Sequence, residues 1–183
     1  MHVSTQVRLV RWSVILAAVL LAGAGTLAFI AVAHLDGLTL KWASPDQITR
    51  ARIDMLNSAW TEAVSAVILA VLAVFLFRPS AKVRAAVWVA APIIALTTLC
   101  FLVGGPEYAV APTGEEPAEV RAEYAQIVPD WYLWPHGVAG LIAAALLIFA
   151  AVFMTRSDLR EYFMDASYDP SRPYTSWVDR TGG

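Results

Sequence analysis

Apolar residues gather into four long runs, separated by shorter segments rich in charge, proline and glycine. The runs cover about residues 12–33, 59–77, 83–103 and 135–154. A helix of about 20 apolar residues crosses the ~30 Å hydrocarbon core of a bilayer, because each residue adds about 1.5 Å. The pattern therefore predicts an all-α polytopic membrane protein. We expect an up-down bundle of four transmembrane helices forming a single membrane domain over residues 1–183.

The first connecting segment, residues 34–58, contains a helix start. In Ser44-Pro45-Asp46-Gln47, the serine can cap, the proline suits the first helical position, and the glutamine can bond back to the cap. No proline or glycine follows until Pro79, so the helix can run unbroken from Pro45 through the second run. Asn57-Ser58 is a competing cap, and a break there would leave a short outer helix near 45–57.

The second connecting segment, residues 104–134, is acidic and predicts a short surface helix near 115–128, which Pro129 ends. Trp131-Tyr132-Leu133-Trp134 follows. It predicts an aromatic belt of Trp131, Tyr132 and Trp134 at the depth of the lipid head groups. The tail, 155–183, predicts one amphipathic turn over 158–164 and no structure of its own beyond Asp169.

Two features of the runs allow alternatives. The first run, with its basic start and Ala31-Val32-Ala33, resembles a signal peptide, but it is longer than such apolar regions and further runs follow, so we expect an uncleaved helix. Pro92 inside the third run predicts a kink, and Thr97 or Thr98 could satisfy the backbone group that it frees.

Positive charge predicts the orientation, because lysine and arginine next to membrane spans favour the cytoplasm. Basic residues lie close to the runs at the N-terminus, in the turn between the second and third runs, and at the start of the tail. They are Arg8, Arg11, Arg78, Lys82, Arg84, Arg156 and Arg160. We expect both termini in the cytoplasm and the segments 34–58 and 104–134 outside a bacterial inner membrane.

Composition narrows the possible functions. Of the 183 residues, 58% are hydrophobic and 15% charged, and the net charge of −2 argues against a nucleic-acid partner. Cys100 is the single cysteine, so a thiol–disulfide oxidoreductase is excluded. The sequence contains none of the common metalloprotease, serine-hydrolase or phosphate-binding motifs. It indicates no catalytic residue, cofactor or metal site.

Three ionisable residues fall at one level near the predicted outer surface. His34 ends the first run, Glu62 begins the second and His136 begins the fourth. If the bundle brings them together, they form a polar site for a proton, a metal or a ligand. Alternatively, the dipole of a helix starting at Ser58 stabilises Glu62, and the histidines mark the interface. A haem held by the paired histidines is a further alternative.

Small residues predict close contacts between helices. They are Gly23 and Gly25 in the first run and Gly137 and Gly140 in the fourth. The four-span layout, with the Trp134-Pro135-x-Gly137 opening of the last run, resembles small four-span inner-membrane proteins of actinobacteria. This resemblance implies the layout and no functional residue.

These observations lead to two main hypotheses. The first is a non-catalytic accessory or scaffold subunit of a larger inner-membrane complex, such as respiratory or cell-envelope machinery, with a membrane-protein partner or a second copy bound in the bilayer. Its basis is the absence of catalytic motifs together with long outer segments. The second is a small channel, transporter or ligand-binding bundle around His34, Glu62 and His136. A haem-binding redox protein is the third.

Overall fold

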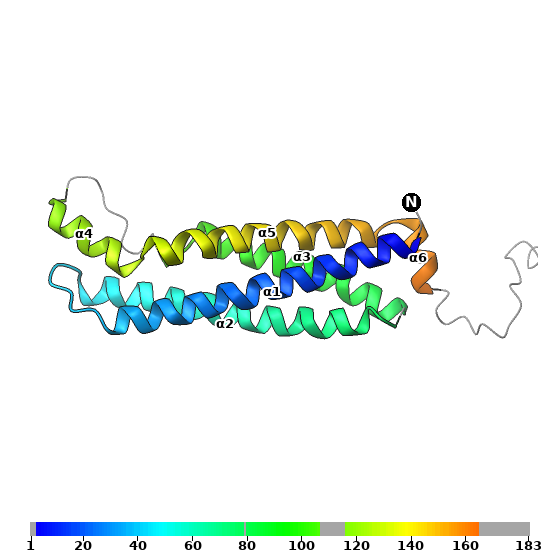
Figure 1. The fold of residues 1–183 in the computed structure, drawn as a ribbon, viewed down its shortest axis with the longest axis horizontal. Helices are drawn as coiled ribbons and strands as arrows, with labels where there is room; N and C mark the ends of the chain where they lie inside the picture. The colour runs from blue at the N-terminus through cyan, green and yellow to red at the C-terminus, as the bar shows by residue number, and fades with distance from the viewer. Residues whose placement is uncertain (1–2, 79, 107–115, 165–183) are drawn as a thin grey trace, which may run out of the picture.

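Six helices make up the computed structural model, which describes residues 3–78, 80–106 and 116–164. They are α1 (Val3–Asp36), α2 (Pro45–Phe75), α3 (Ala81–Val103), α4 (Ala118–Ile127), α5 (Asp130–Met154) and α6 (Ser157–Met164). The four long helices lie side by side, with α4 at one end of the bundle and α6 at the other (Figure 1). Helices α1, α2, α3 and α5 are long and apolar enough to cross a membrane. The predicted all-α four-helix bundle is confirmed.

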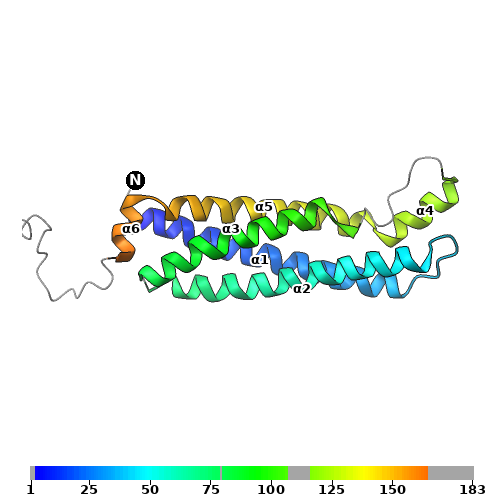
Figure 2. The same ribbon diagram turned by 180° about the vertical axis from the view of Figure 1, so that it is seen from behind.

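Helix α1 occupies the centre of the arrangement. It packs along α2 on one side and α5 on the other, and α3 packs mainly against α5 (Figure 2). Contacts between α2 and α3 are sparse, although a short turn joins these two helices. Helix α5 therefore contacts both α1 and α3.

Helix α2 runs without a break from Pro45 to Phe75. Its start is a capping box: the Ser44 hydroxyl accepts from the Gln47 backbone N–H at 3.2 Å, and the Gln47 side chain accepts from the Ser44 N–H at 3.0 Å. Residues 45–57 are thus the first half of α2 rather than a separate short helix. The alternative break at Asn57-Ser58 does not occur.

The proline in α3 is accommodated differently from our expectation. The hydroxyls of Thr97 and Thr98 donate to the carbonyls of Ile93 and Ile94, each at 2.9 Å. Neither reaches the carbonyl of Trp88, the group that loses its N–H donor because of Pro92. A threonine in a helix bonds back one turn, and both threonines lie on the far side of the proline from that carbonyl.

A carboxylate of α4 binds the segment that connects α1 to α2. Glu123 of α4 accepts three backbone N–H bonds, from Lys41, Trp42 and Ala43, at 2.9, 2.7 and 2.8 Å. Desolvation raises the pKa of Glu123, but the three N–H donors and the charge of Lys41 outweigh it, so its pKa lies below the usual value. Helix α4 forms where a helix near 115–128 was predicted.

The opposite end of the bundle carries the basic residues. The Arg84 guanidinium donates twice to the Met154 carbonyl at the end of α5, at 2.9 and 2.8 Å, and satisfies a carbonyl that the helix leaves free. Arg11 stacks over the Phe77 ring at 4.3 Å. Helix α6 forms at the predicted amphipathic turn. The expectation for the tail beyond Asp169 concerns positions outside the described residues.

Buried apolar side chains form two clusters along the bundle. The cluster toward the α6 end includes Leu21, Leu69 and Leu147. The cluster toward the α4 end includes Met55, Ile127 and Tyr132. On α2 and α5, the residues between these clusters include Glu62 and His136, so a polar layer separates the two apolar cores.

A buried glutamate–histidine pair beside a cavity

Glu62 lies in the middle of α2 and is 3% exposed. It is roughly 25 Å along the helix from Pro45 and 20 Å from Phe75. The proposal that a helix N-terminus at Ser58 stabilises its charge is therefore wrong, since the dipole effect is confined to the first turn and α2 begins more than four turns earlier. Gly25 of α1 permits this burial, because a Cβ atom there would lie 3.4 Å from the Cβ of Glu62.

His136 of α5 supplies the partner for the buried carboxylate. Its Nε2 lies 2.9 Å from Oε1 of Glu62 and 3.1 Å from the hydroxyl oxygen of Ser58. The residue is 6% exposed. The ring of Tyr132, one turn earlier on α5, lies against it with 4.9 Å between ring centroids. Two helices distant in sequence therefore contribute one compact polar group.

The second carboxylate oxygen of Glu62 has an unusual environment. Oε2 is buried, and the structure shows no hydrogen-bond partner for it among the described residues. Burying a polar atom without a partner is costly, because its hydrogen bonds to water are lost without replacement. Only Oε1 of the Glu62 carboxylate therefore has a hydrogen-bond partner among the described residues.

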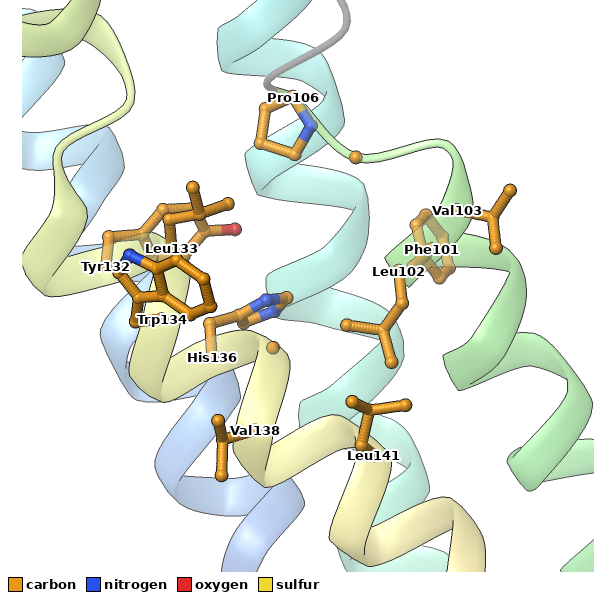
Figure 3. Close-up of a pocket in the computed structure, with 12 residues that line it drawn as sticks. Phe101, Leu102, Val103, Pro106, Tyr132, Leu133, Trp134, His136, Val138 and Leu141 are labelled. Carbon is orange, nitrogen blue, oxygen red and sulfur yellow. The ribbon is translucent and has the colours of Figure 1, made fainter.

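A cavity of about 390 Å³ adjoins the pair. It lies between the end of α3 and the first half of α5, and its wall includes Leu102, Trp134, Gly137 and Leu141 together with His136. Figure 3 shows the His136 ring reaching from α5 toward α2, with Leu102 extending from α3 into the same region. Its size and mostly apolar wall are typical of sites for small molecules.

His34, the third residue of the predicted polar site, has different neighbours. It is exposed near the end of α1, and its ring packs edge-on against Trp131 at 5.8 Å. The structure therefore joins Glu62 and His136 and leaves His34 apart from them. Within the described ranges, no group of three or more His, Cys, Asp or Glu side chains could hold a metal ion.

The aromatic belt divides between two faces of α5. Trp131 and Trp134 are 43% and 68% exposed, as interface residues would be, whereas Tyr132 is fully buried. Tyr132 therefore does not belong to the belt. Residues three and four apart share a helix face, so Trp131 aligns with Trp134, and Tyr132 aligns with His136.

The four glycines also differ. A Cβ atom at Gly25 would lie 3.1 Å from the Ala59 carbonyl oxygen, and one at Gly140 would lie 3.3 Å from Leu102 and Thr98 side-chain atoms. At Gly137 the nearest atom would be 4.0 Å away, and at Gly23 no atom lies within 4 Å. Close helix contact is thus seen at Gly25 and Gly140.

Sequence reasoning missed Ser58 and Tyr132 as members of the site. Each lies four residues before an identified residue, Ser58 before Glu62 and Tyr132 before His136. That spacing places each pair on one helix face, and it was the available signal. Comparisons with protein-family models, with curated proteins and with solved structures gave no match.

Proposed function

We propose that this protein is a membrane bundle that binds a small amphiphilic ligand in the cavity between α3 and α5. The observation that carries the proposal is the buried Glu62–His136 pair, whose histidine forms part of the cavity wall. An apolar cavity with one or two directed polar groups is the usual form of a small-molecule site. A channel or transporter would be a more elaborate version of the same binding function.

The energetics of the pair support this proposal. Burying two ionisable groups costs more desolvation energy than burying apolar side chains of similar size. Such pairs therefore contribute little to the stability of a fold. Ionisable groups inside membrane spans are by default candidates for function. The partnerless Oε2 of Glu62 adds a further cost that apolar packing would avoid. The stability of the fold therefore does not explain why Glu62 and His136 occupy these buried positions.

The proposed location of the protein is a bacterial inner membrane, which it spans with both termini in the cytoplasm. The basic residues Arg11, Arg84 and Arg156 lie at the end of the bundle that carries α6 and support this orientation. With that end inside, the cavity opens at the depth of the outer leaflet. A ligand would then enter from the lipid or from the outer aqueous side.

A cavity-filling variant tests the proposal. Gly137→Leu places a side chain in the cavity, where a Cβ atom meets nothing closer than 4.0 Å. Gly23→Leu is the matched control, since no atom lies within 4 Å of a Cβ atom at Gly23 of α1. Labelling of Pro135 and Ala139, which share a separate groove with Gly23, is left out of the comparison. Vesicles containing each protein are irradiated with an alkyl diazirine of fatty-chain length, and the labelled residues are mapped by mass spectrometry.

We expect the wild type and Gly23→Leu to be labelled at residues 101–106 and 132–141, and Gly137→Leu to lose most of this labelling. Equal labelling of all three proteins would show that the probe reaches these residues from the surrounding lipid. That result would contradict ligand binding in the cavity.

A second candidate function, an accessory subunit, is favoured by the outer layer. The three bonds of Glu123 join α4 to residues 41–43, and a surface held in this way suits recognition by another protein. Disrupting this surface with Glu123→Ala should then release a partner from native detergent extracts, while cavity labelling is unchanged. A wild-type particle containing one copy of the chain and no other protein would exclude this candidate.

A further inference from the structure

The proton that Glu62 and His136 share determines which hydrogen bonds the site offers. A net charge inside a bilayer is disfavoured, so the pair is most stable when its total charge is zero. Zero charge is reached with a carboxylate facing an imidazolium, or with a carboxylic acid whose hydrogen on Oε1 faces a neutral imidazole. A hydrogen on Oε2 is disfavoured, because that buried atom has no acceptor among the described residues. In both forms a single proton lies between Oε1 and Nε2, which are 2.9 Å apart.

Both forms leave a hydrogen on Nδ1 of His136. An imidazolium carries hydrogens on both ring nitrogens, and a neutral imidazole whose Nε2 accepts from Glu62 carries its hydrogen on Nδ1. Both contacts that the ring makes with α2 use Nε2. Nδ1 is therefore the ring nitrogen left for a ligand in the cavity, and it is a donor wherever the shared proton sits.

The cavity wall limits the charge of the ligand. None of the described residues that line the cavity is lysine or arginine, so an anionic head group would have no cation to pair with. Glu62 is not among the lining residues, and a cationic head group would meet the Nδ1 hydrogen of His136 before reaching a carboxylate. An uncharged hydrogen-bond acceptor avoids both problems.

From these contacts we infer that the cavity binds an uncharged lipophilic carbonyl compound, such as a long-chain ketone or a quinone, whose oxygen accepts a hydrogen bond from Nδ1 of His136. This inference rests on the proposed ligand-binding function and specifies its ligand class. The apolar wall formed by residues such as Leu102, Leu141 and Val138 receives the chain or ring.

Competition against the diazirine probe tests the ligand class. Four competitors share one chain length and differ in the head group: an alkyl methyl ketone, the alkane, the alkylammonium and the fatty carboxylate. We expect the ketone to block cavity labelling at a membrane concentration roughly three- to tenfold lower than the alkane, the difference that one hydrogen bond makes. The two charged compounds should compete no better than the alkane.

Two variants of His136 separate its two nitrogens. In His136→Gln the amide reaches the position of Nε2, so the bond to Glu62 is retained and the donor at Nδ1 is lost. In His136→Asn the amide takes the position of Nδ1, so the donor remains and the bond to Glu62 is lost. We expect His136→Gln to abolish the ketone preference and His136→Asn to retain it, with folding checked for both by size-exclusion chromatography and circular dichroism.

The outcomes distinguish the two proposals. If the cavity is not labelled in the wild type, the proposed function fails. If it is labelled but the ketone and the alkane compete equally, or a charged compound competes best, ligand binding stands and the carbonyl inference is overturned. A ketone preference that persists in folded His136→Gln would also overturn it. If neither variant folds, the relative potency of the four competitors on the wild-type protein decides whether the carbonyl inference holds.

Discussion

Gly25 of α1 lies directly against Glu62 of α2. Because Gly25 has no side chain, the two helices can approach closely at the buried carboxylate. A Cβ atom at Gly25 would be 3.4 Å from the Cβ of Glu62 and 3.1 Å from the carbonyl oxygen of Ala59. A contact of 3.1 Å requires the neighbouring backbone to move. The position of Glu62 relative to His136 therefore depends on a residue that does not line the cavity beside the pair.

Substitution at Gly25 should destabilise the bundle. Gly25→Val forces α1 and α2 apart, and overpacking of this kind typically costs about 1–3 kcal/mol. Gly23→Val makes the same chemical change two residues away, where no atom lies within 4 Å. We expect a lower melting temperature in detergent for Gly25→Val and little change for Gly23→Val. Equal losses would attribute the effect to helix propensity rather than to the contact with α2.

The Glu62–His136 pair should show strong coupling in a double-mutant cycle. Removing one partner leaves the other buried without its bond, which costs about 3–5 kcal/mol. Glu62→Met and His136→Phe should each reduce the free energy of unfolding, while the double variant should come close to the wild type because it buries apolar groups only. The free energies are measured by unfolding in increasing mole fractions of denaturing detergent.

In this cycle, additive losses would show that the two side chains do not interact in the folded protein. A double variant as stable as the wild type whose cavity is still labelled but shows no ketone preference would separate function from stability. That combination would assign the pair to ligand binding.

The membrane bundle itself was predictable from sequence because its determinants are local. The length of each apolar run requires a spanning helix, and Ser44 with Gln47 marks the start of α2 through bonds within one turn. Glu62 was identified for the same reason, as an acid inside an apolar run. These features need no knowledge of which helices are neighbours.

The membership of the site was not predictable to the same extent. The sequence predicts His34, Glu62 and His136 near one level, but the structure sets Gly25 of α1, not His34, against Glu62. Which side chains meet depends on the rotation of each helix and on the placement of α1 between α2 and α5. That placement brings the faces of Ser58 and Tyr132 to the pair and leaves His34 against Trp131. Contacts between distant segments determine it, and a single sequence does not display them.

The bonds of Glu123 should make the contact between α4 and residues 41–43 sensitive to acid. The pKa of this carboxyl lies below its usual value of 4.5, because the N–H donors of residues 41–43 and Lys41 outweigh desolvation. A carboxyl with a depressed folded-state pKa contributes stability that is fully present above the unfolded value and is lost as the pH falls through the folded value. We expect the amides of Lys41, Trp42 and Ala43 to lose hydrogen-exchange protection below about pH 4.5.

Two variants provide the comparison for this acid effect. Glu123→Ala should expose the same three amides at neutral pH, whereas Glu119→Ala, an exposed position on the same helix, should leave them protected. Protection is measured by exchange with mass spectrometry after correction for the intrinsic rate at each pH. Amides that stay protected in Glu123→Ala would mean that other contacts hold the loop.

Thiol labelling should place the two ends of the bundle on opposite sides of the membrane. Asp46→Cys lies at the exposed start of α2 and Lys82→Cys at the exposed start of α3, each in a Cys100→Ser background. Because basic residues such as Arg84 favour the cytoplasm, a membrane-impermeant maleimide should react with the first thiol in intact cells and with the second only after permeabilisation. The reverse result would place the cavity in the inner leaflet and exclude ligand entry from the outer side, while equal reaction of both thiols in intact cells would argue against a bundle that spans the bilayer.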